Sequence, residues 1–227
     1  MSREAVIFGT VPDTTFWIGE DLGGLADVLG GASRRGDPLA PRTVVVPNSL
    51  VGQWLEQSLA RRASGGFDGV AANLDVILPA TFIGRAIYDD PADLERWSVD
   101  GFALALLGAR RDERELTVNE AWRRAQRLAD LLYWRPEQLE DYLETGGNER
   151  ERAVLRQLDE QGVPSPWAAL EGRLERVEDV FGERLVLFDC GELTMGDLMT
   201  RVVARLSGRV SVDGYFVGPG SDDLDGA

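Results

Sequence analysis

Short apolar runs near both ends of the chain predict buried strands. These runs cover residues 5–8, 43–46, 70–78, 185–188 and 210–217. Several are continuous and rich in β-branched residues, which is typical of strands covered on both faces of a parallel sheet. Gly9 and Pro47 follow the first two runs directly and end them. The pattern therefore predicts a parallel α/β sheet.

Helical spacing of apolar residues follows most of these runs. We expect helices over residues 15–29, 49–62, 79–88 and 196–206. The second is the clearest, because Ser49 can cap it and apolar side chains recur at helical spacing. Those apolar positions are Leu50, Trp54, Leu55 and Leu59.

Between the two groups of strands the pattern is helical throughout. The expected helices cover residues 91–108, 118–132, 136–145, 149–160 and 166–181, separated by turns containing Gly or Pro. The sequence thus predicts an α/β core that is interrupted by an all-helical insert. Its parts are residues 1–88 (first part of the core), 89–182 (insert), 183–217 (return of the core) and 218–227 (disordered tail).

Composition removes most catalytic chemistry. All 24 basic residues are arginine, and the chain has neither lysine nor histidine, a skew that a GC-rich genome explains. Without histidine there is no Ser-His-Asp triad, Cys-His pair or histidine metal site. Without lysine the chain lacks the residue that contacts phosphate in the phosphate loop of an ATPase. The single cysteine, Cys190, excludes an internal disulfide, and no stretch is apolar enough to span a membrane, so we expect a cytoplasmic protein.

The net charge is −15 and the pI is near 4.5. A chain that binds DNA alone and without sequence preference should be basic, so this charge argues against such a function. A basic channel completed by a partner is still compatible with it. A solvated acidic surface is the simplest interpretation.

Candidate sites are few. The expected first strand-to-helix turn, residues 9–15, lacks the glycine spacing and the Lys-Ser/Thr pair of a phosphate loop. Asp189 follows an apolar strand as a magnesium-binding acid would, but a loop cap is the favoured interpretation. Cys190 has no histidine to activate it, which indicates a small buried residue. Glu192 has no specific support as a base.

Aromatic and basic side chains in the helical regions allow two interpretations. Trp97, Trp122 and Trp134 could stack on bases, although packing between helices is favoured. The pairs Arg61-Arg62, Arg110-Arg111 and Arg123-Arg124 could contact phosphate, although solvated helix faces are favoured.

Four stretches resemble the RecC-type gamma chain of exodeoxyribonuclease V, the bacterial RecBCD helicase–nuclease. They are Thr43-Val-Val-Val-Pro-Asn-Ser-Leu-Val-Gly-Gln-Trp-Leu55, Ala71-Ala-Asn-Leu-Asp-Val-Ile-Leu-Pro-Ala-Thr-Phe-Ile83, Leu128-Ala-Asp-Leu-Leu-Tyr-Trp-Arg-Pro136 with Leu143-Glu-Thr-Gly146, and the segment from Arg184 to Val217. Their order and spacing agree with that family over nearly the whole chain. Pro47 and Gly84 depart from it, since a Gln and an aromatic residue are common at those positions.

The resemblance implies a RecA-like core of a superfamily 1 helicase that has lost its ATPase motifs. It implies a non-catalytic subunit, without cofactor or metal of its own, that binds a RecB-type helicase–nuclease chain and works beside a RecD-type helicase. ATP and Mg²⁺ would be bound by these partners. The implied DNA-binding residues, which would contact a duplex end or the unwound single strand, are Ser49, Gln53, Leu78, Asp130 and Arg135.

Two other hypotheses stay open. The chain could be a stand-alone, helicase-like interaction module that has lost DNA handling, which its charge and short length would suit. It could also be an autonomous metal-using enzyme with Asp189 and Glu192, which is the least favoured. Full gamma chains are several times longer, so a fragment, an excised domain and a short relative are all compatible with the sequence.

Overall fold

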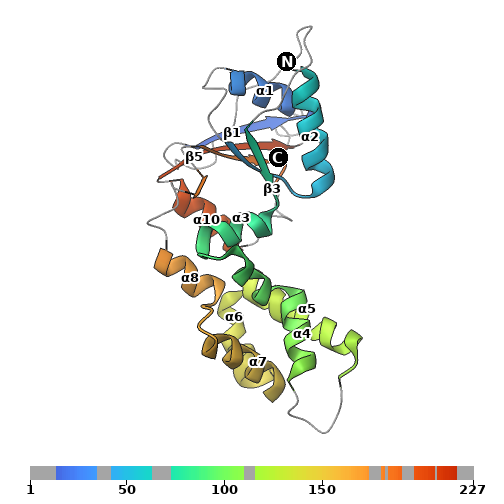
Figure 1. Cartoon of the computed structure of the whole chain (residues 1–227), viewed down its shortest axis with the longest axis vertical. Helices are drawn as coiled ribbons and strands as arrows, with labels where there is room; N and C mark the ends of the chain where they lie inside the picture. Colours follow the sequence, from blue (N-terminus) through green and yellow to red (C-terminus); the bar gives the residue numbers. More distant parts are fainter. Residues whose placement is uncertain are drawn as a thin grey trace, which may run out of the picture. The chain divides into compact units, whose positions relative to one another are not determined.

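The computed structural model describes residues 14–34, 42–62, 73–109, 116–173, 180–181, 184–190, 197–207 and 209–218. The chain divides into two compact units (Figure 1). The sheet unit comprises Met1–Phe82, Glu175–Met195 and Val203–Ala227. The helical unit comprises Ile83–Leu174 and Gly196–Val202.

The sheet unit is built on five parallel strands in the order β1-β5-β4-β2-β3. The strands are β1 (Thr14–Gly19), β2 (Arg42–Val45), β3 (Leu74–Ile77), β4 (Arg184–Phe188) and β5 (Ser211–Val217). The predicted parallel α/β fold is confirmed, and four strands lie where apolar runs predicted them. Burial explains this success, because most residues of β2 and β4 are fully enclosed.

The prediction for the start of the chain was wrong in part. Residues 15–19 were expected to be helical, but Thr14–Gly19 forms β1, and helix α1 (Leu22–Arg34) begins after it. The segment is rich in β-branched and aromatic residues, which favour a strand when a neighbour offers matching side chains. Trp17 lies opposite Tyr215 of β5, with the two rings stacked at 6.3 Å. The strand expected at residues 5–8 and the tail at 219–227 lie outside the described residues.

One face of the sheet is covered by α1 and α2 (Ser49–Arg62) (Figure 1). Phe188 of β4 occupies the middle of this core, with its ring 6.4 Å from that of Trp54 and 6.3 Å from that of Tyr215. Burying each such side chain contributes about 1.5–3 kcal/mol. The other core residues are Leu25, Ala26, Leu29, Val44, Val46, Leu55, Leu59 and Val186.

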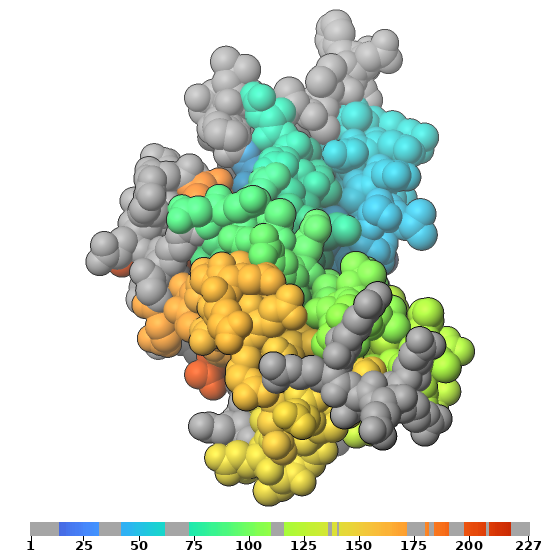
Figure 2. Space-filling view, turned by 60° about the horizontal axis from the view of Figure 1, so that its bottom comes forward, coloured from blue at the N-terminus to red at the C-terminus, as the bar shows by residue number. Residues whose placement is uncertain are grey.

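The described part of the helical unit contains helices and turns only. Helices α3 (Pro79–Ile87) and α10 (Asp197–Leu206) contribute residues to both units. The other elements are η1 (Pro91–Trp97), α4 (Val99–Gly108), α5 (Val118–Trp134), α6 (Pro136–Asp141), η2 (Tyr142–Gly146), α7 (Glu149–Glu160) and α8 (Pro166–Arg173). Helices α4 and α5 pack side by side (Figures 1 and 2).

The helix expected over residues 91–108 is divided at Ser98. The Ser98 hydroxyl donates to the carbonyl of Glu95 at 2.6 Å and accepts the N–H of Gly101 at 3.1 Å. It thereby ends the 3₁₀ helix η1 and caps α4. Serine competes in this way for backbone groups, which an apolar pattern does not reveal.

Buried hydroxyl and indole groups tie the helices together through backbone carbonyls. Tyr133 donates to the carbonyl of Trp97 at 3.2 Å, Tyr88 to that of Pro164 at 2.7 Å, and the Trp167 indole to that of Leu132 at 2.6 Å. Burial raises the pKa of Tyr88 and of Tyr133 well above the usual range, so both hydroxyls stay protonated donors.

Substitution of Gly101 by alanine should destabilise the helical unit by at least about 2 kcal/mol. A Cβ at this position would overlap the backbone carbonyl groups of Glu95 and Arg96, which cannot move without disrupting the cap of α4. Gly108→Ala, in the same helix with nothing within 4 Å of its Cβ, is the matched control. Urea unfolding should separate the two variants, and equal stabilities would contradict the packing described.

Candidate nucleic-acid interface

The carboxyl ends of β2 and β3 meet at one edge of the sheet. The two strands pair in parallel, with Val45 opposite Ile77, and the N–H of Val46 donates to the carbonyl of Ile77 at 3.0 Å. The chain therefore leaves both strands at the same edge. Ser49 and Leu78 lie just after the two strand ends.

A side-chain cap determines how α2 begins at this edge. The Asn48 carbonyl oxygen Oδ1 accepts the N–H groups of Leu50 at 3.1 Å and Val51 at 3.0 Å. Ser49 and Gln53 are one helical turn apart, and both side chains are exposed. The structure thus brings Ser49, Gln53 and Leu78 to one edge of the sheet unit, which we call the β2–β3 edge.

The β2–β3 edge is uncharged and partly apolar. Leu50 is 75% exposed and Leu78 is 40% exposed. Leu50 belongs to the predicted helical spacing of α2, but unlike Leu55 and Leu59 it is not buried. No charged residue occurs in residues 43–55 or 76–84, although the whole chain carries −15. A polyanion therefore meets no carboxylate from these two segments.

Gly84, one of the two departures from the family pattern, is buried in α3. A Cβ at this position would lie 3.0 Å from the carbonyl oxygen of Pro91. No aromatic side chain fits there. The helical unit has thus adapted to the small residue.

The remaining two implied DNA contacts lie in the helical unit. Asp130 is on the exposed face of α5, and Arg135 follows the last residue of that helix. Pro136 disfavours helical backbone at Arg135, whose φ of −143° and ψ of 56° interrupt the helix. The exposed Arg135 side chain therefore projects from a junction between α5 and α6. Trp134 beside it is 46% exposed.

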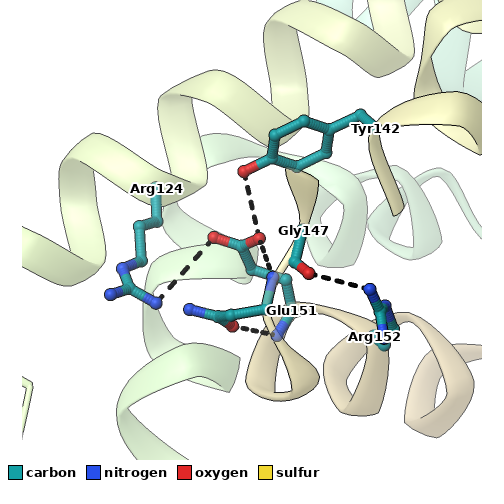
Figure 3. A network of polar contacts seen from close by, with 6 residues as sticks. Arg124, Tyr142, Gly147, Glu151 and Arg152 are labelled. Atoms are coloured by element: carbon teal, nitrogen blue, oxygen red, sulfur yellow. Dashed lines mark hydrogen bonds and ion pairs between the residues drawn. The ribbon is translucent and has the colours of Figure 1, made fainter. Parts of the chain in front are cut away.

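A buried carboxylate organises the segment that follows (Figure 3). Glu151 of α7 accepts the Tyr142 hydroxyl and the Asn148 N–H, both at 3.1 Å, and lies 4.0 Å from the guanidinium of Arg124. Asn148 in turn accepts the N–H of Glu151 at 3.0 Å, completing a capping box. These contacts join α5, η2 and α7.

Arg152 stabilises the π-helical turn η2 from the other side. Its guanidinium donates to the carbonyls of Leu143 and Glu144. It also donates to the carbonyl of Gly147 at 3.0 Å (Figure 3). A cation at the carbonyl end of a helical turn compensates groups that have no helical partner. The network therefore holds residues 143–146 in place after α6.

The turn from β1 to α1 is where a nucleotide-binding protein would hold phosphate. Its sequence Gly19-Glu-Asp-Leu-Gly-Gly-Leu-Ala26 has the two-glycine spacing of a phosphate loop, with Leu25 and Ala26 in place of the lysine and the Ser/Thr. This turn was missed because the turn was expected at residues 9–15, of which 9–13 lie outside the described residues. The repeated glycines after residue 18 were the available signal.

Three features of this turn oppose anion binding. The Asp21 carboxylate accepts the N–H of Gly24 at 2.8 Å and so occupies the helix N-terminus. Glu20 and Asp21 place two negative charges there. Leu25 and Ala26 are buried in the core, where Leu25 lies against Gly19.

Asp189 and Cys190 follow β4 at the same edge of the sheet. Asp189 has a φ of +55°, which aspartate tolerates better than most residues, and its N–H donates to the carbonyl of Tyr215 at 2.6 Å. Burial raises the pKa of its carboxyl, and a hydrogen bond from the Val217 backbone lowers it. The carboxyl thus contacts the end of β5, and the loop that it was expected to cap continues into residues 191–196, outside the described residues. Glu192 lies outside the described residues.

Cys190 is buried, as expected. Its thiol lies 3.4 Å from the carbonyl oxygen of Val45, and burial raises its pKa to about 12. A thiol with so high a pKa is a poor nucleophile.

The tryptophans and arginines of the helical regions differ in how exposed they are and in what they contact. Trp97 is buried against Phe102, as the packing interpretation predicted, but Trp122 is 41% exposed and Trp134 is exposed as well. Arg61 and Arg123 lie on solvated faces, whereas Arg124 contacts Glu151. Arg110 and Arg111 lie outside the described residues.

Among the residues that the structure describes, no group of three or more acidic or cysteine side chains could hold a metal ion. A search of the same residues finds no helix that is both long and apolar enough to cross a membrane.

Residues 22–99 match the family model described as RecC, N-terminal domain. The match includes the β2–β3 edge and α3. The predicted resemblance to the N-terminal portion of RecC-type chains is therefore confirmed over these residues. No curated protein matches the chain.

Alkylation should test the environment of Cys190. Iodoacetamide at pH 8 should modify the native protein at least about a hundredfold more slowly than the urea-unfolded protein, because only the unfolded thiol has an ordinary pKa. The unfolded thiol also ionises first as pH rises from 9 to 12, which favours unfolding. Wild type should therefore lose about 1.4 kcal/mol relative to Cys190→Ala one pH unit above the free-thiol pKa. Equal alkylation rates would contradict this.

The double variant Leu25→Lys/Ala26→Thr restores the phosphate-loop consensus and should still not bind Mg-ATP. Both side chains face the core, so we expect a loss of about 3 kcal/mol or more in unfolding free energy. Asp21→Ser is the folded comparison, because it retains a capping oxygen and removes one charge. Calorimetric titration with Mg-ATP tests both variants, and saturable binding by either would show that the turn can still open around phosphate.

Proposed function

We propose, from the match of residues 22–99 to the RecC N-terminal domain, that this chain is a non-catalytic DNA-handling subunit, or part of one, in a RecBCD-type complex. In this role it binds a helicase–nuclease chain and guides one unwound DNA strand. ATP hydrolysis and nucleolysis belong to its partners.

The β2–β3 edge is the observation that carries the DNA-handling part of the proposal. It combines an exposed amide, an exposed hydroxyl and two exposed leucines, and its two segments contain no charge. An amide can read the edge of a base, and apolar side chains can contact its face. Gln53 and Leu78 are the proposed contacts to bases, with Ser49 at the start of α2 as a polar contact.

Arg135 supplies a different kind of contact. It is an exposed cation at a helix junction, and a guanidinium binds phosphate oxygens regardless of base sequence. Asp130, five residues earlier, is an exposed carboxylate on α5, and a carboxylate can accept a hydrogen bond from a base.

The β1–α1 turn supports the non-catalytic part of the proposal. Its glycine spacing fits a RecA-like helicase core that once held a nucleotide, and its buried Leu25 and capping Asp21 fit the loss of that function. A complex of this kind then requires partners that hydrolyse ATP.

A stand-alone interaction module is the second candidate function. The net charge of −15 and the exposure of Leu50 favour it, since an exposed leucine in an uncharged surface also suits a protein partner. Under this alternative the chain would bind a partner but not DNA.

Co-expression with a RecB-type chain tests the proposal directly. The two chains should co-purify, and the complex should bind a forked DNA with single-stranded arms. Gln53→Ala should weaken that binding about fivefold, the usual cost of one hydrogen bond, with no change in its salt dependence. Arg135→Ala should weaken it similarly and reduce the slope of log affinity against log salt by about 0.7, the value for one single-strand phosphate contact.

Matched variants separate these contacts from general effects. Gln57→Ala lies one turn further along α2, and Arg156→Ala lies on the exposed face of α7; both should bind like wild type. Co-purification without DNA contacts from this chain would favour the interaction module. Failure of both co-purification and DNA binding would refute the proposal.

A further inference from the structure

We propose that the solvent-facing side of α5 is a single-stranded DNA-binding face, on which Trp122 and Trp134 stack on bases and Arg123 and Arg127 neutralise phosphates. The inference rests on the proposed function and extends it, because none of these four residues belongs to the contacts that the family resemblance implies.

Helix α5 has two distinct sides. The inner side is buried, and small residues allow close packing against α4; its members are Ala121, Ala125, Leu128, Ala129 and Leu132. The outer side carries the exposed residues Asn119, Trp122, Arg123, Gln126, Arg127, Asp130 and Trp134. Two half-exposed tryptophans on one helix are costly in water, which points to a ligand with flat apolar surfaces.

The outer side separates aromatic and basic groups into adjacent rows. Trp122 and Gln126 are one turn apart, and so are Arg123 and Arg127, each pair forming a row along the helix. A strand lying along α5 can place bases over the first row and phosphates over the second. Trp134 lies two turns beyond Arg127, at the end of the second row, where its indole can stack on a base as the strand leaves the helix. The distance along the axis from Trp122 to Trp134 is about 18 Å, which spans several nucleotides.

Charge complementarity favours nucleic acid as the occupant. Helix α5 carries three arginines and two carboxylates, a positive balance in a chain whose net charge is −15. Arg124 is directed to Glu151, but Arg123 and Arg127 form no ion pair with another residue of the described segments. Proteins that bind single strands without sequence preference combine aromatic side chains, which stack on bases, with basic groups, which contact phosphates. The outer side of α5 carries both kinds of side chain.

A protein partner is the competing occupant. Leu104 of α4 and Val118 of α5 are also strongly exposed, and aliphatic side chains suit a protein interface better than a DNA strand. These residues lack the basic and aromatic pairing of the outer side of α5. Leu104 therefore serves to distinguish the two occupants.

Binding of a fluorescein-labelled oligo(dT) to the full chain, followed by anisotropy at low salt, tests the inference. Trp122→Ala should weaken binding about 5- to 100-fold, the loss expected for one base–aromatic stack, and Trp122→Phe should retain most of the affinity. Arg123→Gln/Arg127→Gln should reduce the salt slope by about 1.4, which is 0.7 for each phosphate contact. Trp122→Ala should leave that slope unchanged.

Arg156→Gln and Leu104→Ala are the controls and should bind oligo(dT) like wild type. Absence of wild-type binding, or wild-type affinity in both Trp122→Ala and the double arginine variant, would overturn the inference. The face would instead belong to a protein partner if Leu104→Ala and Trp122→Ala each abolished co-purification with the RecB-type chain and each left oligo(dT) binding unchanged. Gln53→Ala and co-purification test the proposed function, whereas oligo(dT) binding by the α5 variants tests this inference. The proposed function and the inference can therefore fail independently of each other.

Discussion

The parallel pairing of β2 with β4 on one side and β3 on the other is the constraint on which the rest of the sheet unit depends. Val44 lies opposite both Val186 and Val76, so burial of branched apolar side chains sets the register. Because all five strands point the same way, every strand ends at one edge. The β1–α1 turn, Asp189 and the β2–β3 edge are consequently brought to that edge by core packing alone.

This arrangement separates the β1–α1 turn from the β2–β3 edge within the sheet. The β1–α1 turn follows β1, which among the described strands pairs only with β5, whereas the β2–β3 edge follows strands on the far side of β4. Acidic residues and a buried Leu25 alter the β1–α1 turn without affecting the β2–β3 edge. The capping Asp21 and the core-facing Leu25 and Ala26 each oppose phosphate binding at this turn for a different reason.

Sequence patterns predicted the elements that burial dominates. Strands β2, β4 and β5 and helices α2 and α7 lie close to their predicted positions, because continuous apolar runs or a clear cap leave few alternatives. Strand β1 was not predicted, since the first strand was placed at residues 5–8 and the residues from Thr15 on were assigned to the helix after it, whereas Trp17 pairs with Tyr215 across the sheet. The break at Ser98 depends on one hydroxyl and has no signature in the apolar pattern.

The candidate site was predictable to a smaller extent. Resemblance identified Ser49, Gln53 and Leu78, and the pairing of β2 with β3 shows why they lie together. The exposure of Leu50, Trp122 and Trp134 could not be predicted, because helical spacing assigns apolar residues to the core unless the neighbouring elements are known. Whether an apolar residue is a packing residue or a contact for a ligand is decided by what covers it.

The acidity of the chain is compatible with DNA binding because charge acts over a limited distance in salt. At physiological ionic strength the field of an exposed charge is screened over about 8–10 Å, so a phosphate responds chiefly to the groups beside it. Segments 43–55 and 76–84 of the β2–β3 edge contain no charged residue, and the outer side of α5 carries two arginines and one aspartate. The remaining carboxylates weaken non-specific approach of DNA more than they weaken contact at these surfaces. An acidic chain with neutral and basic contact surfaces is therefore suited to holding a strand that a partner delivers, and its binding of free single strands should be strongest at low salt.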